Sequence, residues 1–268
     1  MMSKLFKGLA WLRDVIQVLV LDRFDARRKI SSQQASSACR MLRFHSRAKI
    51  AGAPLDEIIS MLGVKPPGSV ELPGPDTTLG ELGSRAGYYV LGSLVKALQP
   101  DAILEFGTYL GVSAHSMALN ATANCRIYTV DLPDQASPEM VSGLNALDQQ
   151  HVRKSRFRVG EAFLGGPTEK QIVQIRADSL TFQAESRMNH ADFVYIDGGH
   201  TRPIITKDTE NAFRILSPHG TIVWDDYFHL YPAVVAFLDD LADRYPLYRI
   251  AGSNYVIYSR RLANSRVK

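Results

Sequence analysis

The sequence predicts an α/β fold in which a mostly parallel sheet carries helices on both faces. The first observation is that short apolar runs alternate with segments of helical apolar spacing from residue 79 to residue 259. This is the pattern of parallel strands joined by crossover helices. The second observation is that carboxylates follow several of these runs, where ligands bind in open parallel sheets. The length of 268 residues, 46% of them hydrophobic, accommodates one such domain with an extension.

We expect a helical N-terminal extension over residues 1–78 and a sheet domain over residues 79–268. The spacing of apolar residues predicts helices within the extension at residues 3–24, 33–50 and 54–62. The prolines and glycines between residues 66 and 75 break the chain, so this stretch is the expected linker.

The charge is distributed unevenly along the chain. Residues 1–50 carry a net charge of +8, whereas the remainder carries −4. A basic leader of this kind suits a peripheral membrane surface or another anionic partner. The alternative is a solvated helical face or a contact between the subunits of a homo-oligomer.

We expect the chain to be cytoplasmic. It has no run of about 18 uncharged apolar residues, so a transmembrane helix is not expected. A signal peptide is not expected either, because Arg13 and Asp14 interrupt the N-terminal hydrophobic region. The two cysteines, Cys39 and Cys125, are expected to be free thiols in a reducing compartment.

The sheet domain opens with an expected helix at residues 79–98 and then alternates strands and helices. The expected strands are residues 102–106, 126–130, 172–175, 192–196, 221–224, 248–251 and 255–259. One expected helix begins at about residue 112, and two others span residues 203–216 and 233–244. The variable segment 133–166 is expected to combine helix and loop.

A glycine-bearing turn joins the first strand to its helix, within the run from Ile103 to Ser113. Gly107 and Gly111 allow the backbone to approach a ligand closely, and the helix that follows offers free N–H groups to it. The run is Glu-x-Gly-x-x-x-Gly-x-Ser. It fits neither the dinucleotide fingerprint nor the P-loop pattern.

This run resembles motif I of class I S-adenosylmethionine-dependent methyltransferases, and most closely the catechol and caffeoyl-CoA O-methyltransferase type. The resemblance implies a Rossmann-like class I sheet of seven strands, ending in short sixth and seventh strands. It also implies that S-adenosylmethionine binds along the loop and the next two strand ends. The residues expected to bind it are Glu105, Gly107, Thr108, Tyr109, Gly111, Ser113, Asp131, Asp178 and Ser179.

Two strand ends supply further cofactor contacts. Asp131 ends the second strand, where a carboxylate can accept both hydroxyls of a ribose; the alternative is an acidic strand-end cap. Asp178, with Ser179 beside it, is expected to accept from the adenine amino group. Its alternative is a helix N-cap, and the two roles are compatible.

Three more acids end the fourth and fifth strands: Asp197, Asp225 and Asp226. Carboxylates on neighbouring strand ends repel one another, and a divalent cation relieves this repulsion. Oxygen ligands suit Mg²⁺ or Mn²⁺. The set resembles that of metal-dependent O-methyltransferases, especially the bacterial enzymes that methylate sugar hydroxyls of macrolide and aminocoumarin antibiotics. In the alternative, Asp225 and Asp226 only cap the strand and Asp197 lines the pocket without metal.

The expected reaction is methyl transfer to a hydroxyl of a small molecule or sugar. His200, three residues after Asp197, is a candidate general base, and Asp197 is the second candidate catalytic residue. The alternative for His200 is a partner of an Asp or of the cofactor. The sugar-modifying relatives often carry a second Asp near this position, where this chain has Gly199 and His200.

Two rival functions remain at this point. One is a metal-free methyltransferase of the same fold, with His200 or an Asp as base. The other is a methyltransferase-like binding module without catalysis, although the retained carboxylates argue against it. Nucleic acid is not an expected partner, because the catalytic half is net acidic.

Overall fold

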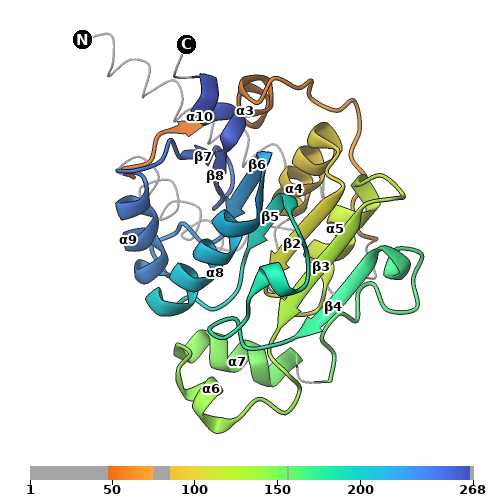
Figure 1. The fold of residues 1–268 in the computed structure, drawn as a ribbon, viewed down its shortest axis with the longest axis vertical. Coiled ribbons are helices and arrows are strands. Elements are labelled where there is room, and N and C mark those ends of the chain that lie inside the picture. Colours follow the sequence, from red (N-terminus) through yellow and green to blue (C-terminus); the bar gives the residue numbers. More distant parts are fainter. Residues whose placement is uncertain (1–47, 75–84, 156, 266–268) are drawn as a thin grey trace, which may run out of the picture.

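The computed structural model describes residues 48–74, 85–155 and 157–265 (Figure 1). The predicted helix at 3–24, most of the one at 33–50 and the basic charges of residues 1–47 lie outside these residues. The same is true of residues 79–84 and of the predicted boundary between residues 78 and 79. The division into two regions therefore stays a prediction.

The described residues form an eight-stranded sheet in the order β1-β7-β8-β6-β5-β2-β3-β4. The strands are β1 (Gly52–Ala53), β2 (Ala102–Phe106), β3 (Arg126–Asp131), β4 (Ile172–Arg176), β5 (Ala191–Ile196), β6 (Leu216–Trp224), β7 (Tyr248–Ile250) and β8 (Val256–Ser259). Only β8 runs antiparallel to its neighbours β6 and β7 among these strands. This is the Rossmann-like class I methyltransferase fold, which confirms the predicted fold class.

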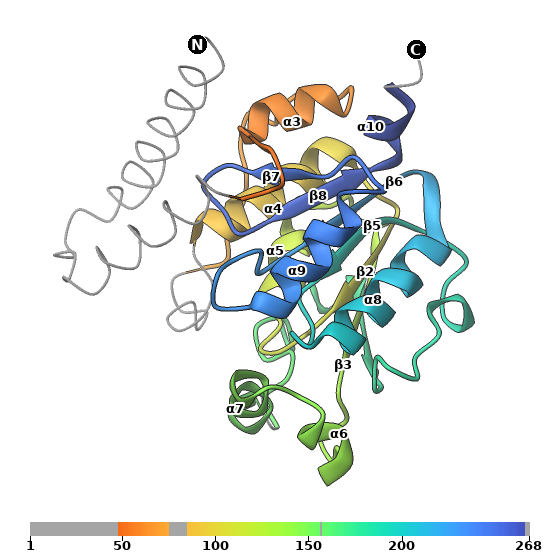
Figure 2. The same cartoon turned by 90° about the vertical axis from the view of Figure 1, so that its left-hand side faces the viewer.

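Helices cover both faces of the sheet, as Figures 1 and 2 show. On one face α8 (Arg202–Ile215) and α9 (Pro232–Leu241) pack against the strands. The other face is covered by α3 (Leu55–Met61), α4 (Arg85–Leu98), α5 (Val112–Asn120) and α10 (Arg260–Ser265). Because both faces are buried, the central strands β2 and β5 are predominantly apolar and do not alternate between apolar and polar residues.

The sequence missed two small elements. The predicted seven strands become eight because β1, from the segment assigned to the extension, pairs in parallel with β7. A two-residue strand has no periodicity to detect. Residues 48–50, the end of a predicted helix, are not helical, and the C-terminal helix α10 was not predicted.

The variable segment carries α6 (Pro138–Ser142) and α7 (Ala146–Ser155), so the expected mixture of helix and loop is confirmed. The hydroxyl of Ser137 caps α6 by accepting the amide of Met140. Both helices lie beyond the end of the sheet to which the parallel strands point (Figures 1 and 2). One 3₁₀ turn, Glu169–Gln171, precedes β4, and another, Ala184–Ser186, lies between β4 and β5.

Candidate functional site

The glycine loop after β2 adopts a backbone that only glycine accommodates at two positions. Gly107 has φ +96°, and a Cβ there would lie 1.9 Å from the carbonyl oxygen of Asp197. Gly111 has φ +80° and ends the loop as the N-cap of α5. A Cβ at Gly111 would lie 2.6 Å from the ring of Phe163. The loop is therefore pressed between the end of β5 and the variable segment, as a close backbone approach requires.

The tip of this loop is fixed by hydrogen bonds from two sides. Tyr109 has φ +45°, an uncommon conformation for a residue other than glycine. Its amide donates to Oδ2 of Asp131 at 2.7 Å. Its carbonyl accepts the amide of Gly160 at 2.9 Å. Asp131, predicted to bind a ribose, thus lies against the loop tip and also accepts the amide of Leu132.

Beneath the loop, a chain of hydroxyls leads to Glu105. Thr129 donates to Oε2 of Glu105 at 2.5 Å, and the hydroxyl of Thr108 lies 2.7 Å from that of Thr129. Since Thr129 has one proton to donate, Thr108 is the donor to it. Burial raises the pKa of Glu105 to about 7, while the nearby Ser113 and the hydrogen bond from Thr129 lower it. Glu105 is fully buried, so it supports the loop from below; its predicted cofactor contact stays a prediction.

Asp178 and Ser179 follow β4, beside the end of β3. Oδ1 of Asp178 accepts the amide of Leu180 at 2.9 Å, so this carboxylate closes its own turn. The residues that follow form a turn and not a helix, so the alternative of a helix N-cap is wrong. Ser179 lies close enough to Asp208 of α8 to lower the pKa of its carboxyl group. Both residues lie at the strand end expected for adenine, and their cofactor roles stay predictions.

Asp208 is a buried acid that the sequence analysis did not single out. It lies on the buried face of α8, and a Cβ on Gly198 would lie 3.0 Å from its Oδ2. Neither carboxylate oxygen of Asp208 has a hydrogen-bond partner among the described residues. Burial raises the pKa of Asp208 to about 8, the nearby Ser179 lowers it and the charge of Asp178 raises it. Ionisation of this side chain therefore opposes folding.

We expect Asp208→Asn to stabilise the protein increasingly as the pH rises from about 4 to about 8. In this window the folded protein holds a proton that the unfolded chain has released. The wild type therefore loses up to about 1.4 kcal/mol of stability per pH unit, a loss that asparagine cannot show. Urea denaturation of both proteins at the two ends of the window measures the difference. Equal differences at both pH values would contradict the prediction.

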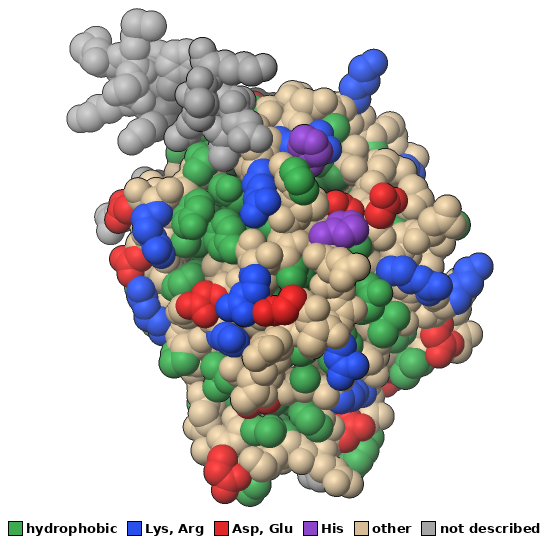
Figure 3. Space-filling view, viewed as in Figure 1, with side chains coloured by type: hydrophobic (Ala, Val, Ile, Leu, Met, Phe, Trp, Pro, Cys, Tyr) green, Lys and Arg blue, Asp and Glu red, His purple; other side chains and the backbone are tan. Residues whose placement is uncertain are grey.

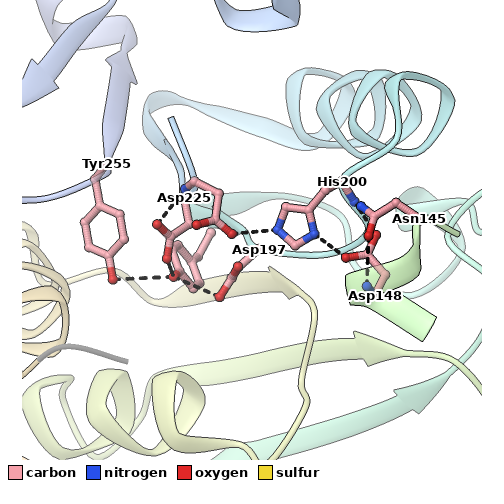
Figure 4. A network of polar contacts seen from close by, with 8 residues as sticks. Asn145, Asp148, Asp197, His200, Asp225 and Tyr255 are labelled. Carbon is pink, nitrogen blue, oxygen red and sulfur yellow. Dashed lines mark hydrogen bonds and ion pairs between the residues drawn. The ribbon is translucent and has the colours of Figure 1, made fainter. Parts of the chain in front are cut away.

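Asp197, Asp225, Asp226 and His200 meet near the ends of β5 and β6. Figure 4 labels Asp197, His200 and Asp225 of this set. The two strands are parallel neighbours, and the amide of Asp225 donates to the carbonyl of Ile196 at 3.0 Å. One ligand atom each of Asp197, His200 and Asp226 lies within 4.8 Å of the other two. We call these four residues the acidic centre.

The ring of His200 lies between two carboxylates. Its Nδ1 is 2.5 Å from Oδ1 of Asp148, and its Nε2 is 2.6 Å from Oδ2 of Asp226. Burial would lower the pKa of His200, but the hydrogen bonds to Asp148 and Asp226 raise it to about 11. The ring also stacks on Tyr231, with centroids 4.2 Å apart. His200 thus has the Asp partner foreseen as the alternative; its role as a base stays a prediction.

The other two acids turn toward the interior. Both Asp197 and Asp225 face the hydroxyl of Tyr195, and Oδ1 of Asp225 accepts the amide of Asp226. Burial and the neighbouring acids raise the pKa of Asp197, and burial and Asp226 raise that of Asp225 to about 7. Asp226 has φ +60°, so backbone strain accompanies the crowded charge.

Two residues of this network escaped the sequence analysis. Asp148 belongs to α7, where its amide is capped by Oδ1 of Asn145, and its spacing from His200 carries no signal. Tyr195 did carry one, because it lies two residues before Asp197 on a strand and hence on the same face. From the sequence, Tyr195 was assigned only to the apolar run of the expected strand.

The comparison with protein families now decides the assignment. Residues 104–227, from β2 through the acidic centre, match the family model described as a methyltransferase domain. This part of the chain is therefore similar to methyltransferase domains. The resemblance inferred from the glycine loop is thereby confirmed at the level of the family.

A mouse (Mus musculus) protein described as "Transmembrane O-methyltransferase homolog" is 29% identical over 153 residues, 56% of this chain and 52% of its own length. The chain therefore spans about half the length of this curated relative. Within the described residues, no helix of the methyltransferase domain or its flanks is long and apolar enough to cross a bilayer.

Solved structures similar to this chain include other methyltransferases. S-adenosylhomocysteine-bound PaMTH1 from Podospora anserina has a TM-score of 0.48 and 16% identity, covering 87% of this chain and 97% of its own. TomG from Streptomyces achromogenes, in complex with S-adenosylmethionine, has a TM-score of 0.47, 16% identity and coverages of 85% and 99%. The O-methyltransferase NovP has a TM-score of 0.49, 15% identity and coverages of 67% and 83%.

Proposed function

We propose that this chain is an S-adenosylmethionine-dependent O-methyltransferase assisted by a divalent cation. The observation that carries the proposal is the acidic centre, which lies beside the glycine loop because Gly107 touches the backbone of Asp197. The turn proposed to bind the cofactor thus lies next to a set of oxygen donors, as transfer to a substrate hydroxyl requires.

The residues of the loop fit the cofactor. The loop follows a strand and opens a helix, and its glycines leave the backbone open to close approach. Asp131 at the loop tip offers carboxylate oxygens at the position expected for a ribose. When bound, S-adenosylmethionine supplies the methyl group on a sulfonium that is attacked in line. Glu105 and Thr108 hold the loop in shape from beneath.

The acidic centre fits a hard divalent cation, Mg²⁺ or Mn²⁺. Asp197, Asp225 and Asp226 are oxygen donors, and the raised pKa values of Asp197 and Asp225 reflect burial and mutual repulsion that a cation would relieve. When bound, the cation lowers the pKa of the substrate hydroxyl and orients it. His200 lies within reach of the same set.

The proton of the substrate hydroxyl needs an acceptor, and His200 and Asp197 are the two proposed groups. His200 uses Nε2 for this role, and this atom faces Asp226 in the structure. Nε2 of His200 therefore accepts the substrate proton only after it has released the proton that it shares with Asp226. Asp197 accepts through a carboxylate oxygen, and its raised pKa favours holding the proton.

A neutral hydroxyl on a small molecule or sugar is the proposed substrate. On the face drawn in Figure 3, basic side chains are interspersed with acidic and apolar ones and form no continuous stripe. A nucleic acid would favour a basic stripe along its backbone. The anionic or membrane contact suggested for residues 1–50 involves residues outside the described part, apart from 48–50.

The first experiment is calorimetry with S-adenosylmethionine and S-adenosylhomocysteine. We expect micromolar or tighter binding, and we expect Asp131→Ala to weaken it by about 1–3 kcal/mol because the ribose hydroxyls lose their acceptor. Glu185→Gln, an exposed acid paired with Arg214, is the control and should bind like the wild type. Absence of binding to the wild type would refute the proposed function. Unchanged binding by Asp131→Ala would refute only the role of Asp131.

A further inference from the structure

Tyr195 lies under the acidic centre. It comes from β5, is 1% exposed and shares its strand face with Asp197. Its hydroxyl is 2.8 Å from Oδ2 of Asp225 and 3.1 Å from Oδ2 of Asp197. One phenol therefore connects Asp197 and Asp225, two acids from neighbouring strand ends that are labelled in Figure 4.

Tyr255 supports this phenol from the other side. Its hydroxyl lies 3.4 Å from that of Tyr195, and the two rings meet edge to face with centroids 5.8 Å apart. Tyr255 is also buried. The edge-to-face packing limits the movement of the Tyr195 ring, so the position of its hydroxyl is fixed by the packed interior.

The hydrogen bonds around the Tyr195 hydroxyl have defined donors and acceptors. A phenol has one proton to donate, so Tyr195 donates to one of its two carboxylates at a time. Asp225 is held at both oxygens, by Tyr195 at Oδ2 and by the amide of Asp226 at Oδ1. Groups that hydrogen-bond metal-binding side chains orient those side chains and tune the affinity for the metal.

We propose that Tyr195 is a positioning residue that sets the orientation of Asp197 and Asp225, with Tyr255 holding the Tyr195 ring in place. The inference rests on the proposed function, since the two acids are taken to bind the cation. The hydroxyl is the part that acts, while the ring fills the core.

The test compares Tyr195→Phe with Tyr255→Phe, because each variant deletes one hydroxyl and keeps the ring. We expect Tyr195→Phe to raise the Mg²⁺ concentration for half-maximal activity roughly 10-fold or more. The same variant should lose most of the Mg²⁺-induced rise in melting temperature. Tyr255→Phe should stay within about threefold of the wild type, because its hydroxyl reaches no carboxylate directly. Calorimetry should show unchanged S-adenosylmethionine affinity in both variants.

The outcomes separate this inference from the proposed function. A wild type that responds to Mg²⁺ and a Tyr195→Phe variant that responds identically would overturn the role of Tyr195 and leave the function standing. A wild type without any Mg²⁺ response would refute the metal part of the function. In that case crystal structures of the wild type and Tyr195→Phe decide: rotated carboxylates support the inference, and unmoved ones overturn it.

A second measurement covers a Tyr195→Phe variant that does not fold. A crystal structure of the wild type with Mg²⁺ should keep the Tyr195 hydroxyl within hydrogen-bond distance of Asp197 or Asp225. A structure in which it contacts neither acid would overturn the inference.

Discussion

Replacing Asp226 with asparagine is expected to lower turnover by about 100-fold or more while leaving the affinity for S-adenosylmethionine within about twofold of the wild type. Asp226 supplies an oxygen to the donor cluster with Asp197 and His200, and asparagine removes its charge. Asparagine tolerates the left-handed backbone of this position, φ +60°, so the fold should persist. Methyl transfer assayed across a Mg²⁺ titration, with calorimetry for the cofactor, measures both effects.

Asp240→Asn is the matched control, since Asp240 is an exposed acid of α9 paired with Arg202. It should keep wild-type turnover. Chelation should abolish turnover of the wild type, and Mg²⁺ or Mn²⁺ should restore it. Full activity in excess chelator, with no metal found by elemental analysis, would contradict the cation and leave a metal-free methyltransferase that uses His200 or an Asp as base.

Asp197→Asn provides a readout of the acidic centre that does not depend on activity. Burial, Asp225 and Asp226 raise the pKa of Asp197, so its charge opposes folding when no cation is present. The variant should melt at a higher temperature than the wild type in chelator, and should lose the stabilisation that Mg²⁺ gives the wild type.

Gly107→Ala is expected to have the largest effect on the fold of the site. A Cβ at this position would lie 1.9 Å from the backbone oxygen of Asp197, and φ is +96°. Backbone atoms cannot rotate away as a flexible side chain would, so the loop or the end of β5 must shift. We expect a loss of more than about 3 kcal/mol of stability, together with loss of cofactor binding. Thermal unfolding and calorimetry check these two results.

Gly63→Ala is the control that separates the strain of a left-handed backbone from the steric clash expected in Gly107→Ala. Gly63 also has a left-handed backbone, φ +75°, but a Cβ there has no neighbour within 4 Å. Its variant should lose only about 1–2 kcal/mol, the cost of the left-handed backbone. If Gly107→Ala loses no more than Gly63→Ala, the close approach of the loop to Asp197 is not a constraint on the fold.

The central strands and the meeting of the acids were predictable from sequence. The apolar run Ala102–Phe106 and the glycines after it define a strand and a turn by local chemistry alone. The proximity of Asp197 and Asp225 was predictable, because the parallel strands β5 and β6 end at the same edge of the sheet. These inferences needed only periodicity and the order of the elements along the chain.

The hydrogen-bond partners of the site residues could not be predicted from periodicity or chain order. Asp148 reaches His200 from a variable segment, although the two residues are 52 positions apart in sequence, and no periodicity links the two positions. The pairing of β1 with β7 likewise joins the described N-terminal residues to the end of the sheet.

The sequence by itself determined the order of strands and helices, the glycine loop and the carboxylates at the strand ends, since each depends on neighbouring residues. Only the tertiary structure decided that His200 lies between two acids, that Tyr195 joins Asp197 to Asp225 and that Glu105 is buried beneath the loop. The physical reason is that burial and hydrogen-bond geometry depend on segments distant in sequence, and these set the charge and orientation of every group in the site.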